Sequence, residues 1–359
     1  MRKLTIDGKT IQDDSDCWVI AEIGHNHQGK LETAKEMFRV AKESGADAVK
    51  LQKRDNRALY TKEGYRKPYE NLNSYGATYG EHREALEFGW YEYKELKDYA
   101  EEIGVTFFST AFDFPSADFL AKLDMPAYKI ASGDLKNIPL LKHIAQIQKP
   151  MIVSTGGGTM EDVNRAYDAI MPINQQLALL QCTAGYPAEF EELNLRVITS
   201  FRERFPDTVV GLSSHDNGIA MAVAAYMLGG RVVEKHFTLN HTWKGTDHAF
   251  SLEPIGFTKM VRDLQRTRVA MGDGVKQTYD SEVNPIIKMG KKIVAARDLR
   301  KGHSLQREDL TLKSPGDGLP PYEMEKVIGR VTVKALSEDD DITFDALNGA
   351  EKLSEAAAS

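Results

Sequence analysis

Cysteine is nearly absent from this chain: its 359 residues contain two, Cys17 and Cys182, which lie far apart and form no CxxC spacing. They supply neither a disulfide framework nor a zinc cage, and both are predicted to be buried strand residues because free cysteine behaves as a small hydrophobe. Long apolar runs are missing too. None approaches the roughly 18 residues of a membrane span, and residues 1–16 lack the apolar core of a signal peptide. These absences predict a cytoplasmic protein without a membrane partner.

Basic residues are not in excess, since 46 Lys and Arg stand against 53 Asp and Glu and give a net charge of −7. This balance argues against a sequence-wide attraction to nucleic acid or anionic lipid. The hydrophobic share of 42% and the charged share of 28% are close to globular averages and argue against disorder and fibrous repeats. A chain of this length can hold one large barrel with a small appendage, or two to three ordinary domains.

The dominant pattern is a series of short apolar runs, each followed by an amphipathic stretch. Nearly continuous apolarity is typical of parallel strands that are covered on both faces. The runs are Cys17–Ile23, Asp47–Gln52, Val105–Thr110, Ala127–Ser132, Met151–Thr155, Leu177–Cys182, Val209–Ser213 and Arg231–Phe237. Helices are predicted over Leu31–Ser44, Trp90–Ile103, Met160–Met171, Leu193–Phe205 and Gly218–Leu228. Eight strands with helical crossovers predict a (β/α)8 TIM barrel over residues 1–272. A doubly wound sheet is the alternative, but it usually has fewer strands.

A second composition follows the barrel. Residues 273–287 are polar and contain Gly and Pro, which is typical of a linker. Short alternating segments separated by turns, such as Lys291–Leu299 and Gly329–Leu336, then predict a small β-rich cap domain over 288–350. A domain of about 60 residues is marginal alone, so we expect it to dock on the barrel or on a partner subunit. Residues 351–359 are small and polar and are predicted to form a flexible tail.

One connection is far longer than the usual strand-to-helix loop. It runs over Lys53–Gly89, between the second strand and the helix that begins at Trp90, and it is rich in basic residues and tyrosines. Long loops of this kind are usually functional. We therefore predict an excursion over the mouth of the barrel.

Polar residues mark the ends of the predicted strands, where the active site of a (β/α)8 enzyme lies. They are Glu22, Lys50, Gln52, Ser109, Thr110, Lys129, Ser132, Ser154, Thr155, Thr183, Tyr186, Ser213, His215, Glu234 and His236. Lys50 and Lys129 interrupt apolar strands, and a buried lysine is costly unless an anion or a carboxylate meets it. Two structural ion pairs are one interpretation. We favour a shared site for a small anion such as a phosphorylated carboxylate, because several hydroxyls converge on the same mouth.

Two histidines suggest a metal site. Glu234 and His236 are two residues apart on one strand and share a face, and His215 ends the preceding strand. Imidazoles with oxygen donors suit a divalent first-row metal with open positions, with Mn²⁺ as first choice and Mg²⁺ or Co²⁺ as alternatives. Hydrogen-bonded structural histidines are the plainer interpretation. Competing ligands crowd the end of the first strand, at His25, Asn26 and His27.

Two loop features carry weaker signals. Asp247 follows the eighth strand, where it could be a general base, an acceptor for a sugar hydroxyl or a solvated loop acid. Gly156–Gly158 could let backbone N–H groups approach a phosphate, although a triple glycine alone is weak evidence.

Taken together, these motifs resemble the sialic acid synthase family, whose members condense phosphoenolpyruvate with N-acetylmannosamine or a relative. The similarity spans essentially the whole chain, through Ile20–Gly29, Val49–Lys53, Tyr128–Asp134, Gln181–Pro187, Gly211–His215 and Glu234–Pro254. The segment Ile293–Leu347 looks like the antifreeze-like (SAF) domain of these synthases. The resemblance therefore implies a TIM barrel followed by a SAF domain, and a homodimer in which the swapped SAF domain of each subunit caps the barrel of the other.

The resemblance also implies roles for single residues. It implies that His215 and His236 bind manganese and that phosphoenolpyruvate is held by Lys50, Thr110, Lys129, Ser132, Ser154 and Ser213. Sugar contacts are implied for Gln52, Asp134, Tyr186 and Asp247. Glu22 would orient or deprotonate a reacting group. In the implied reaction the metal polarises an open-chain aldehyde, the enol carbon attacks it, water is captured and phosphate leaves with cleavage of its carbon–oxygen bond.

The exact sugar stays open. Bacterial members that act on the free sugar commonly carry Lys-Arg-Pro-Gly in the cap, where the arginine contacts the N-acetyl group, but this chain has Ser314 within Lys313–Gly316. Products of the Kdn, legionaminic or pseudaminic type are therefore alternatives. The segments Arg66–Phe88 and Thr242–His248 look more like animal-type enzymes that accept the 6-phosphate. That phosphate could be bound by basic residues that could equally form a solvated face, namely Lys62, Arg66, Lys67, Arg83 and Lys244.

Two other classes of function compete with a synthase. A Schiff-base aldolase could use Lys129, if desolvation lowers the pKa of its ammonium group. An interaction protein could keep the barrel as a scaffold while its cap binds a partner or a polysaccharide. The number of polar groups at one mouth argues against a mere scaffold.

Overall fold

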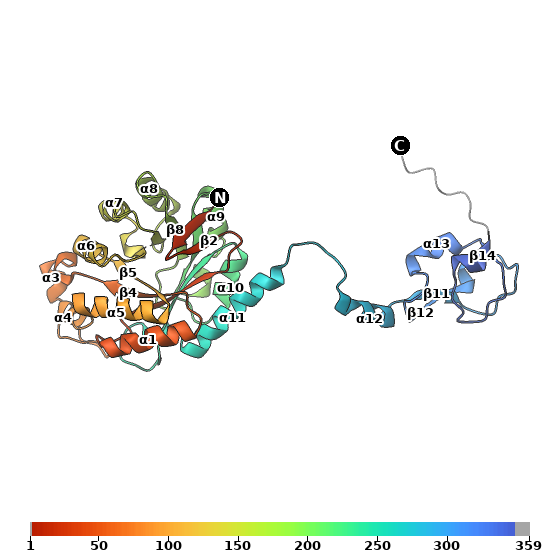
Figure 1. The fold of residues 1–359 in the computed structure, drawn as a ribbon, viewed down its shortest axis with the longest axis horizontal. Coiled ribbons are helices and arrows are strands. Elements are labelled where there is room, and N and C mark those ends of the chain that lie inside the picture. Colours follow the sequence, from red (N-terminus) through yellow and green to blue (C-terminus); the bar gives the residue numbers. More distant parts are fainter. Residues whose placement is uncertain (1, 349–359) are drawn as a thin grey trace. The chain divides into compact units, whose positions relative to one another are not determined.

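The computed structural model describes residues 2–348, which form two compact units with the boundary between Gly272 and Asp273 (Figure 1). The predicted tail at 351–359 and the last two residues of the predicted cap, 349 and 350, lie outside the described residues. In the part of the chain that is described, no helix combines the length and the apolar character that a membrane crossing requires.

The first unit is the predicted (β/α)8 barrel. Eight parallel strands close into a ring in the order β10-β3-β4-β5-β6-β7-β8-β9. The first and last of these strands pair directly, with His236 opposite Glu22, and this pairing closes the barrel. The strands are β3 (Trp18–Gly24), β4 (Ala48–Lys53), β5 (Thr106–Ala111), β6 (Tyr128–Ile130), β7 (Met151–Ser154), β8 (Leu177–Cys182), β9 (Val209–Ser214) and β10 (Val232–His236). All eight fall within the predicted apolar runs or within one residue of them.

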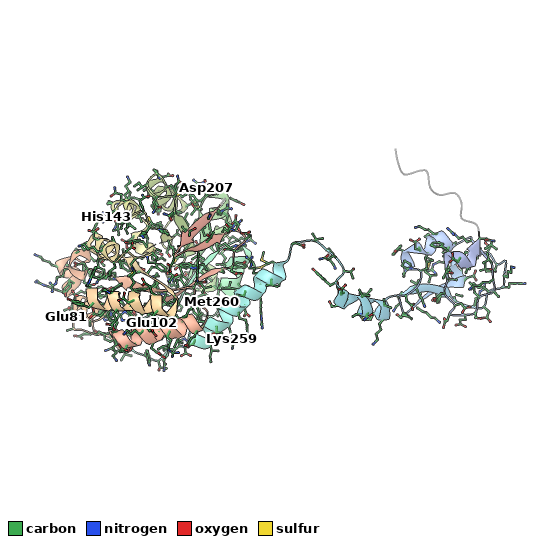
Figure 2. The ribbon with its side chains drawn as sticks, viewed as in Figure 1. Glu81, Glu102, His143, Asp207, Lys259 and Met260 are labelled. Atoms are coloured by element: carbon green, nitrogen blue, oxygen red, sulfur yellow. The ribbon has the colours of Figure 1, made fainter. Side chains whose placement is uncertain are left out.

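Helices cover the outside of the ring (Figure 1). They are α1 (Leu31–Glu43), α5 (Trp90–Ile103), α6 (Phe114–Lys122), α7 (Ile138–Gln146), α8 (Met160–Ile170), α9 (Val197–Arg204), α10 (Ala220–Met227) and α11 (Pro254–Met271). Each buries one face, so that on α11 Met260 is buried while its neighbour Lys259 is exposed (Figure 2). The predicted helix over 193–205 begins too early, because the positive φ of Asn194 interrupts it and α9 starts at Val197.

A hairpin that the sequence reasoning missed fills the barrel from its N-terminal end. Strands β1 (Lys3–Ile6) and β2 (Lys9–Gln12) pair in antiparallel fashion around Asp7 and Gly8, whose positive φ angles fit a tight hairpin turn. Its apolar residues pack with the inward-facing residues at the start of the strands, forming a cluster of Leu4, Ile6, Ile11, Trp18, Ile20, Ala48, Phe108, Ala127, Ile152, Ala178, Leu180, Val209 and Val232. Apolar side chains therefore fill the interior of the barrel at this end.

The excursion after β4 is folded. It contains three short helices, α2 (Asn56–Leu59), α3 (Lys62–Arg66) and α4 (Tyr79–Glu84). A capping box fixes the start of α4, since Thr78 accepts a hydrogen bond from the backbone of Glu81 and the Glu81 side chain accepts one from the backbone of Thr78. The segment therefore presents its side chains from defined positions.

The second unit contains a helix near its start, which overlaps the range 273–287 predicted as a linker. Helix α12 (Asp280–Met289) starts inside that range, because Glu282 caps the backbone N–H of Tyr279. Pro285 lies in the interior of this helix, where a proline has no N–H and so removes one backbone hydrogen bond. The rest contains β11 (Lys292–Ala295), β12 (Leu310–Lys313), α13 (Met324–Val327), β13 (Val331–Thr332) and β14 (Leu347–Asn348) around its own apolar core.

Candidate active site

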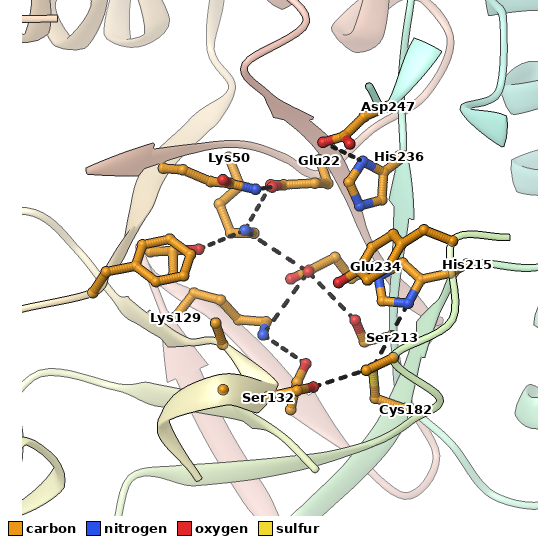
Figure 3. Close-up of a pocket in the computed structure, with 18 of the residues that line it drawn as sticks. Glu22, Lys50, Lys129, Ser132, Cys182, Ser213, His215, Glu234, His236 and Asp247 are labelled. Atoms are coloured by element: carbon orange, nitrogen blue, oxygen red, sulfur yellow. Dashed lines mark hydrogen bonds and ion pairs between the residues drawn. The ribbon is translucent and has the colours of Figure 1, made fainter. Parts of the chain in front are cut away.

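A cavity of about 530 Å³ opens at the carboxyl ends of the barrel strands (Figure 3). Most of the residues singled out from the sequence line it, although they come from all parts of the barrel. They are Glu22, Lys50, Gln52, Arg83, Thr110, Lys129, Ser132, Ser154, Tyr186, Ser213, His215, Glu234, His236 and Asp247. The structure therefore brings the predicted strand ends together in one place.

Alternation along each strand explains this grouping. The apolar cluster around the β1–β2 hairpin forms a plug at the closed end of the barrel, and Val232 of β10 belongs to it. The next inward positions on β10 are Glu234 and His236. On β4, Ala48 belongs to the same plug and Lys50 is the next inward position. The inward faces thus change from apolar at the closed end to charged at the open end.

Two lysines and two carboxylates form the deep part of the cavity (Figure 3). Lys50 Nζ lies 2.6 Å from Glu22 Oε2 and donates to Thr110 Oγ1 at 2.7 Å. Glu234 Oε1 lies 3.8 Å from Lys50 Nζ and 3.9 Å from Lys129 Nζ. The two charged pairs share one buried space, so each ammonium group acts on both carboxylates.

Hydroxyls surround these charges. Lys129 Nζ donates to Ser154 Oγ at 2.6 Å and to the carbonyl of Ile130 at 2.8 Å. Ser213 Oγ lies 3.5 Å from Glu234 Oε1. Fixed ammonium and hydroxyl donors of this kind stabilise an anionic ligand without reorganising.

The two carboxylates differ in proton affinity. Burial raises the pKa of Glu22, although Lys50 opposes the effect. Burial acts in the same way on Glu234, but there Lys129 and Lys50 prevail and hold its pKa below the ordinary value. Carboxyl groups whose pKa values are pushed apart can take different roles in proton transfer. Glu22 is therefore the candidate general acid or base, and Glu234 is a fixed negative charge.

His215 and His236 lie on adjacent strands with ring centroids 5.4 Å apart (Figure 3). The Nδ1 of His215 is 2.8 Å from the carbonyl of Thr183, so this nitrogen donates, and Nε2 keeps its lone pair whenever the ring is neutral. The buried Nδ1 of His236 has no hydrogen-bond partner among the described residues, and Asp247 Oδ2 is 3.9 Å away. Burial lowers the pKa of His236 to about 3, which keeps its ring neutral. Both rings can thus offer a nitrogen to a metal ion.

The protein supplies few further ligands at this place. Within residues 2–348, no group of three or more His, Cys, Asp or Glu side chains is arranged to hold a metal. A pair of imidazoles fits an open site, in which water and substrate complete the coordination, and does not fit a closed structural cage.

Several predicted residues lie elsewhere. Asp134 does not line the cavity and instead accepts a hydrogen bond from Asn137 Nδ2 at 3.1 Å. The possible phosphate ligands Lys62, Arg66 and Lys67 are exposed and also lie outside it, and the exposed Lys244 is stacked over the ring of Tyr75 instead. The exposure of these lysines and of Arg66 is consistent with the solvated face that the sequence left open.

The competing ligands after β3 do not line the cavity either. Asn26 donates to the carbonyl of Phe237 and to Ser251 Oγ. His27 stacks on Phe88 with ring centroids 4.1 Å apart. His25 lies between two arginines and outside the cavity lining.

Two lining residues were missed or underrated. Arg54 lines the cavity immediately after β4, and the signal that could have found it is the alternation of Lys50, Gln52 and Arg54. Cys182 is buried at the end of a strand, as predicted, but its Sγ also faces the site, 3.4 Å from Ser132 Oγ and 3.9 Å from His215 Nδ1.

Comparisons with known proteins agree with the resemblance drawn from the motifs. A sequence model of the NeuB family matches residues 37–276, and a model of the SAF domain matches residues 292–348. The chain is 40% identical to human N-acetylneuraminate-9-phosphate synthase over 336 residues, which cover 93% of this chain and 94% of the human one. It is 36% identical to N,N'-diacetyllegionaminic acid synthase of Legionella pneumophila over 319 residues, 87% of this chain and 89% of the other.

A solved structure is similar as well. The N-acetylneuraminic acid (sialic acid) synthetase of Leptospira borgpetersenii aligns with a TM-score of 0.69 and 28% identity, covering 79% of this chain and 95% of that one. Family and fold thus agree over most of the chain. The chain belongs to the NeuB family of sialic acid and related nonulosonic acid synthases, with a SAF domain at its C-terminal end.

Proposed function

We propose that the protein condenses phosphoenolpyruvate with an open-chain aldose of the N-acetylmannosamine type, free or as the 6-phosphate, to form a nonulosonic acid and phosphate. Membership of the family supports the reaction class. The observation that carries the proposal is the division of one cavity into two parts, with buried lysines and hydroxyls in its depth and two imidazoles beside them.

The deep part suits phosphoenolpyruvate, which carries a carboxylate and a phosphate. Lys50 and Lys129 provide positive charge, and hydroxyl donors surround them at Thr110, Ser132, Ser154 and Ser213. The strands hold these groups in place before the substrate arrives, so little energy is spent on orienting them during the reaction.

His215 and His236 would hold the divalent ion, for which we propose manganese, with magnesium or cobalt as alternatives. When bound there, the ion supplies Lewis acidity to a carbonyl oxygen. Tyr186 and Asp247 line the same side of the cavity and would orient the sugar.

In the proposed reaction the enol carbon of phosphoenolpyruvate forms a bond to the aldehyde carbon, and the aldehyde oxygen gains a proton. Water adds to the neighbouring carbon, loses a proton, and phosphate leaves as the carbon–oxygen bond breaks. Glu22 is placed to move one of these protons, because its pKa is raised by burial and its Oε1 already accepts a hydrogen bond from Gln52 at 2.6 Å. Glu234 keeps its charge and stabilises the cationic carbon through space.

The similar proteins point to different sugars. One is named for N-acetylneuraminate 9-phosphate and the other for N,N'-diacetyllegionaminic acid. Ser314 in the cap leaves N-acetyl recognition to another residue, so sugars of the Kdn and pseudaminic type remain within the proposal.

Mass spectrometry of products tests the proposal directly. The protein is incubated with phosphoenolpyruvate labelled with ¹⁸O at the bridging position and with mannose, N-acetylmannosamine, their 6-phosphates or diacetamido sugars. We expect one of these sugars to give a product heavier by an added pyruvate unit, with the label in the released phosphate. Absence of a product with every sugar, or label retained in the product, contradicts the proposal.

We propose further that the protein is a homodimer in which the SAF domain of one subunit completes the site of the other. A chain that ends before Val283 keeps the whole barrel unit and all the residues that line the cavity. We expect it to fold, and to lose synthase activity by about 100-fold, as is typical when the positioning of a substrate is lost. Light scattering gives the oligomeric state, and release of phosphate gives the activity. Undiminished turnover in the truncated chain would show that the cap has no catalytic role.

A further inference from the structure

A second cationic group lies in the same cavity, apart from the deep lysines. Arg54 follows β4 and Arg83 is on α4, and both side chains line the cavity. Lys50, Gln52 and Arg54 alternate along the chain, so they point to the same side at successive heights. Four residues of extended chain span about 13 Å, which places the backbone of Arg54 nearer the mouth than that of Lys50.

The arginines differ from the lysines in having no carboxylate partner. Within residues 2–348, no carboxylate oxygen lies within 4.0 Å of either guanidinium group. The nearby Glu87 is 3.0 Å from Lys53 Nζ instead. Arg54 is only 7% exposed, and its Cζ lies 3.8 Å from the ring centroid of Phe112. Burying a cation without an anion is costly. An anionic ligand bound between the two arginines would supply the missing negative charge.

Hydrogen-bond acceptors are also scarce between the two arginines. Arg54 donates to Gln52 Oε1 at 2.7 Å, and Arg83 directs two of its nitrogens to the hydroxyl of Tyr79. One nitrogen of each guanidinium group lies 3.3 Å from a different ring nitrogen of His25. A neutral imidazole can accept only one hydrogen bond, and burial together with both arginines holds the pKa of His25 well below its ordinary value. At least one of these N–H groups is therefore left for another acceptor.

We propose that Arg54 and Arg83 bind the phosphate monoester of a phosphorylated sugar, so that the aldose substrate carries its phosphate at the end far from the aldehyde. The inference rests on the proposed synthase function and names its substrate class. Two planar guanidinium forks suit the several oxygens of a phosphate, and a monoester is close to dianionic at neutral pH. The deep lysines already have carboxylates and hydroxyls around them, whereas the arginines have only neutral partners.

Kinetics with matched sugar pairs test the site. Initial rates are measured with mannose and N-acetylmannosamine, each with and without the 6-phosphate. We expect kcat/KM for the phosphorylated member to be higher by about 100-fold or more, because a site built for a polar group rejects an analogue that lacks it. Arg54→Gln and Arg83→Gln should each lower this value by about 30-fold, mainly through KM for the phosphorylated sugar. Both should change KM for phosphoenolpyruvate and the rate with the unphosphorylated sugar by much less than they lower kcat/KM for the phosphorylated sugar.

Two further variants are controls that distinguish a loss of phosphate binding from a loss of folding. Arg54→Lys keeps the charge but loses the fork, so it should show a smaller loss than Arg54→Gln at the same melting temperature. Arg57→Gln removes an exposed arginine of the same excursion, outside the cavity, and should behave like the wild type.

The outcomes separate this inference from the proposed function. Equal kcat/KM for both members of a pair, equal losses for both in Arg54→Gln, or a rise in KM for phosphoenolpyruvate alone would overturn the phosphate site while synthase activity stands. If no sugar is turned over, the synthase proposal fails, and calorimetric titration with mannose 6-phosphate alone decides the site. Binding to the wild type that is lost in Arg54→Gln supports the site, and no binding to the wild type overturns it.

Discussion

Lys129→Met is expected to lower kcat/KM for phosphoenolpyruvate by about 100- to 1000-fold, the usual cost of removing one preorganised donor from the site of a developing charge. Methionine nearly matches lysine in length and fills the same buried space. It cannot donate to Ser154 Oγ, however, nor can it offset the charge of Glu234. The activity is measured as release of phosphate.

The pH dependence of Lys129→Met shows whether the lost positive charge causes the fall in rate. Lys129 is the strongest of the charges that hold the pKa of Glu234 down. The pKa of Glu234 should therefore rise in Lys129→Met, and the acidic limb of the pH–rate profile should move to higher pH. A lowered carboxyl pKa stabilises the folded chain above the ordinary carboxyl range, and that contribution is lost as the pH falls through the folded-state value. The variant should thus lose stability chiefly at neutral pH, as thermal unfolding measured across pH would show.

Matched measurements keep this result interpretable. Lys142→Met removes an exposed lysine of α7 and should leave both rate and profile unchanged. Wild-type turnover in Lys129→Met would refute the assigned role. Borohydride trapping with substrate tests the Schiff-base alternative, because covalent inactivation at Lys129, with activity that survives a chelator, would favour an aldolase.

The barrel and most of the cavity could be predicted because both depend on local alternation. A parallel strand that is buried on both faces must be apolar, and an inward position that is polar must lie where the barrel opens. Four polar residues lie inside such strands, namely Lys50, Lys129, Glu234 and His236. Alternate residues of a strand point to the same face, so the pattern of the strand alone shows that these side chains point into the barrel. The sequence could not decide whether Lys129 binds an anion, forms an ion pair or forms a Schiff base, since it does not show which groups surround the ammonium.

Loop geometry could not be predicted in this way. The sequence marks Lys62, Arg66 and Arg83 as equally basic, but only Arg83 lines the cavity, because a capped helix places it there. The plug formed by β1 and β2 was missed for a related reason. A four-residue strand carries too few alternations to be distinguished from a polar terminus, although the Asp7–Gly8 turn was a usable signal.

His236→Ala is expected to lower the affinity for Mn²⁺ by at least about 100-fold and to remove synthase activity at micromolar metal. Loss of a residue that merely supports a ligand already costs about 10- to 100-fold, so loss of a ligand should cost at least as much. The structural reason is the unpaired Nδ1 of His236. A histidine that serves only the fold should find a partner for its buried nitrogen, yet among the described residues this one has none.

The measurement must separate metal binding from folding. Titration with Mn²⁺ followed by electron paramagnetic resonance gives the affinity, and a dialysed sample gives the metal content. His143→Ala, on the outer helix α7, should retain both metal and activity. Binding of phosphoenolpyruvate should survive in His236→Ala, because the deep lysines and hydroxyls are untouched. A variant that keeps its metal and its turnover would assign His236 a structural role. A variant that keeps its metal but loses turnover would place the ion elsewhere and leave His236 as a contact to the sugar.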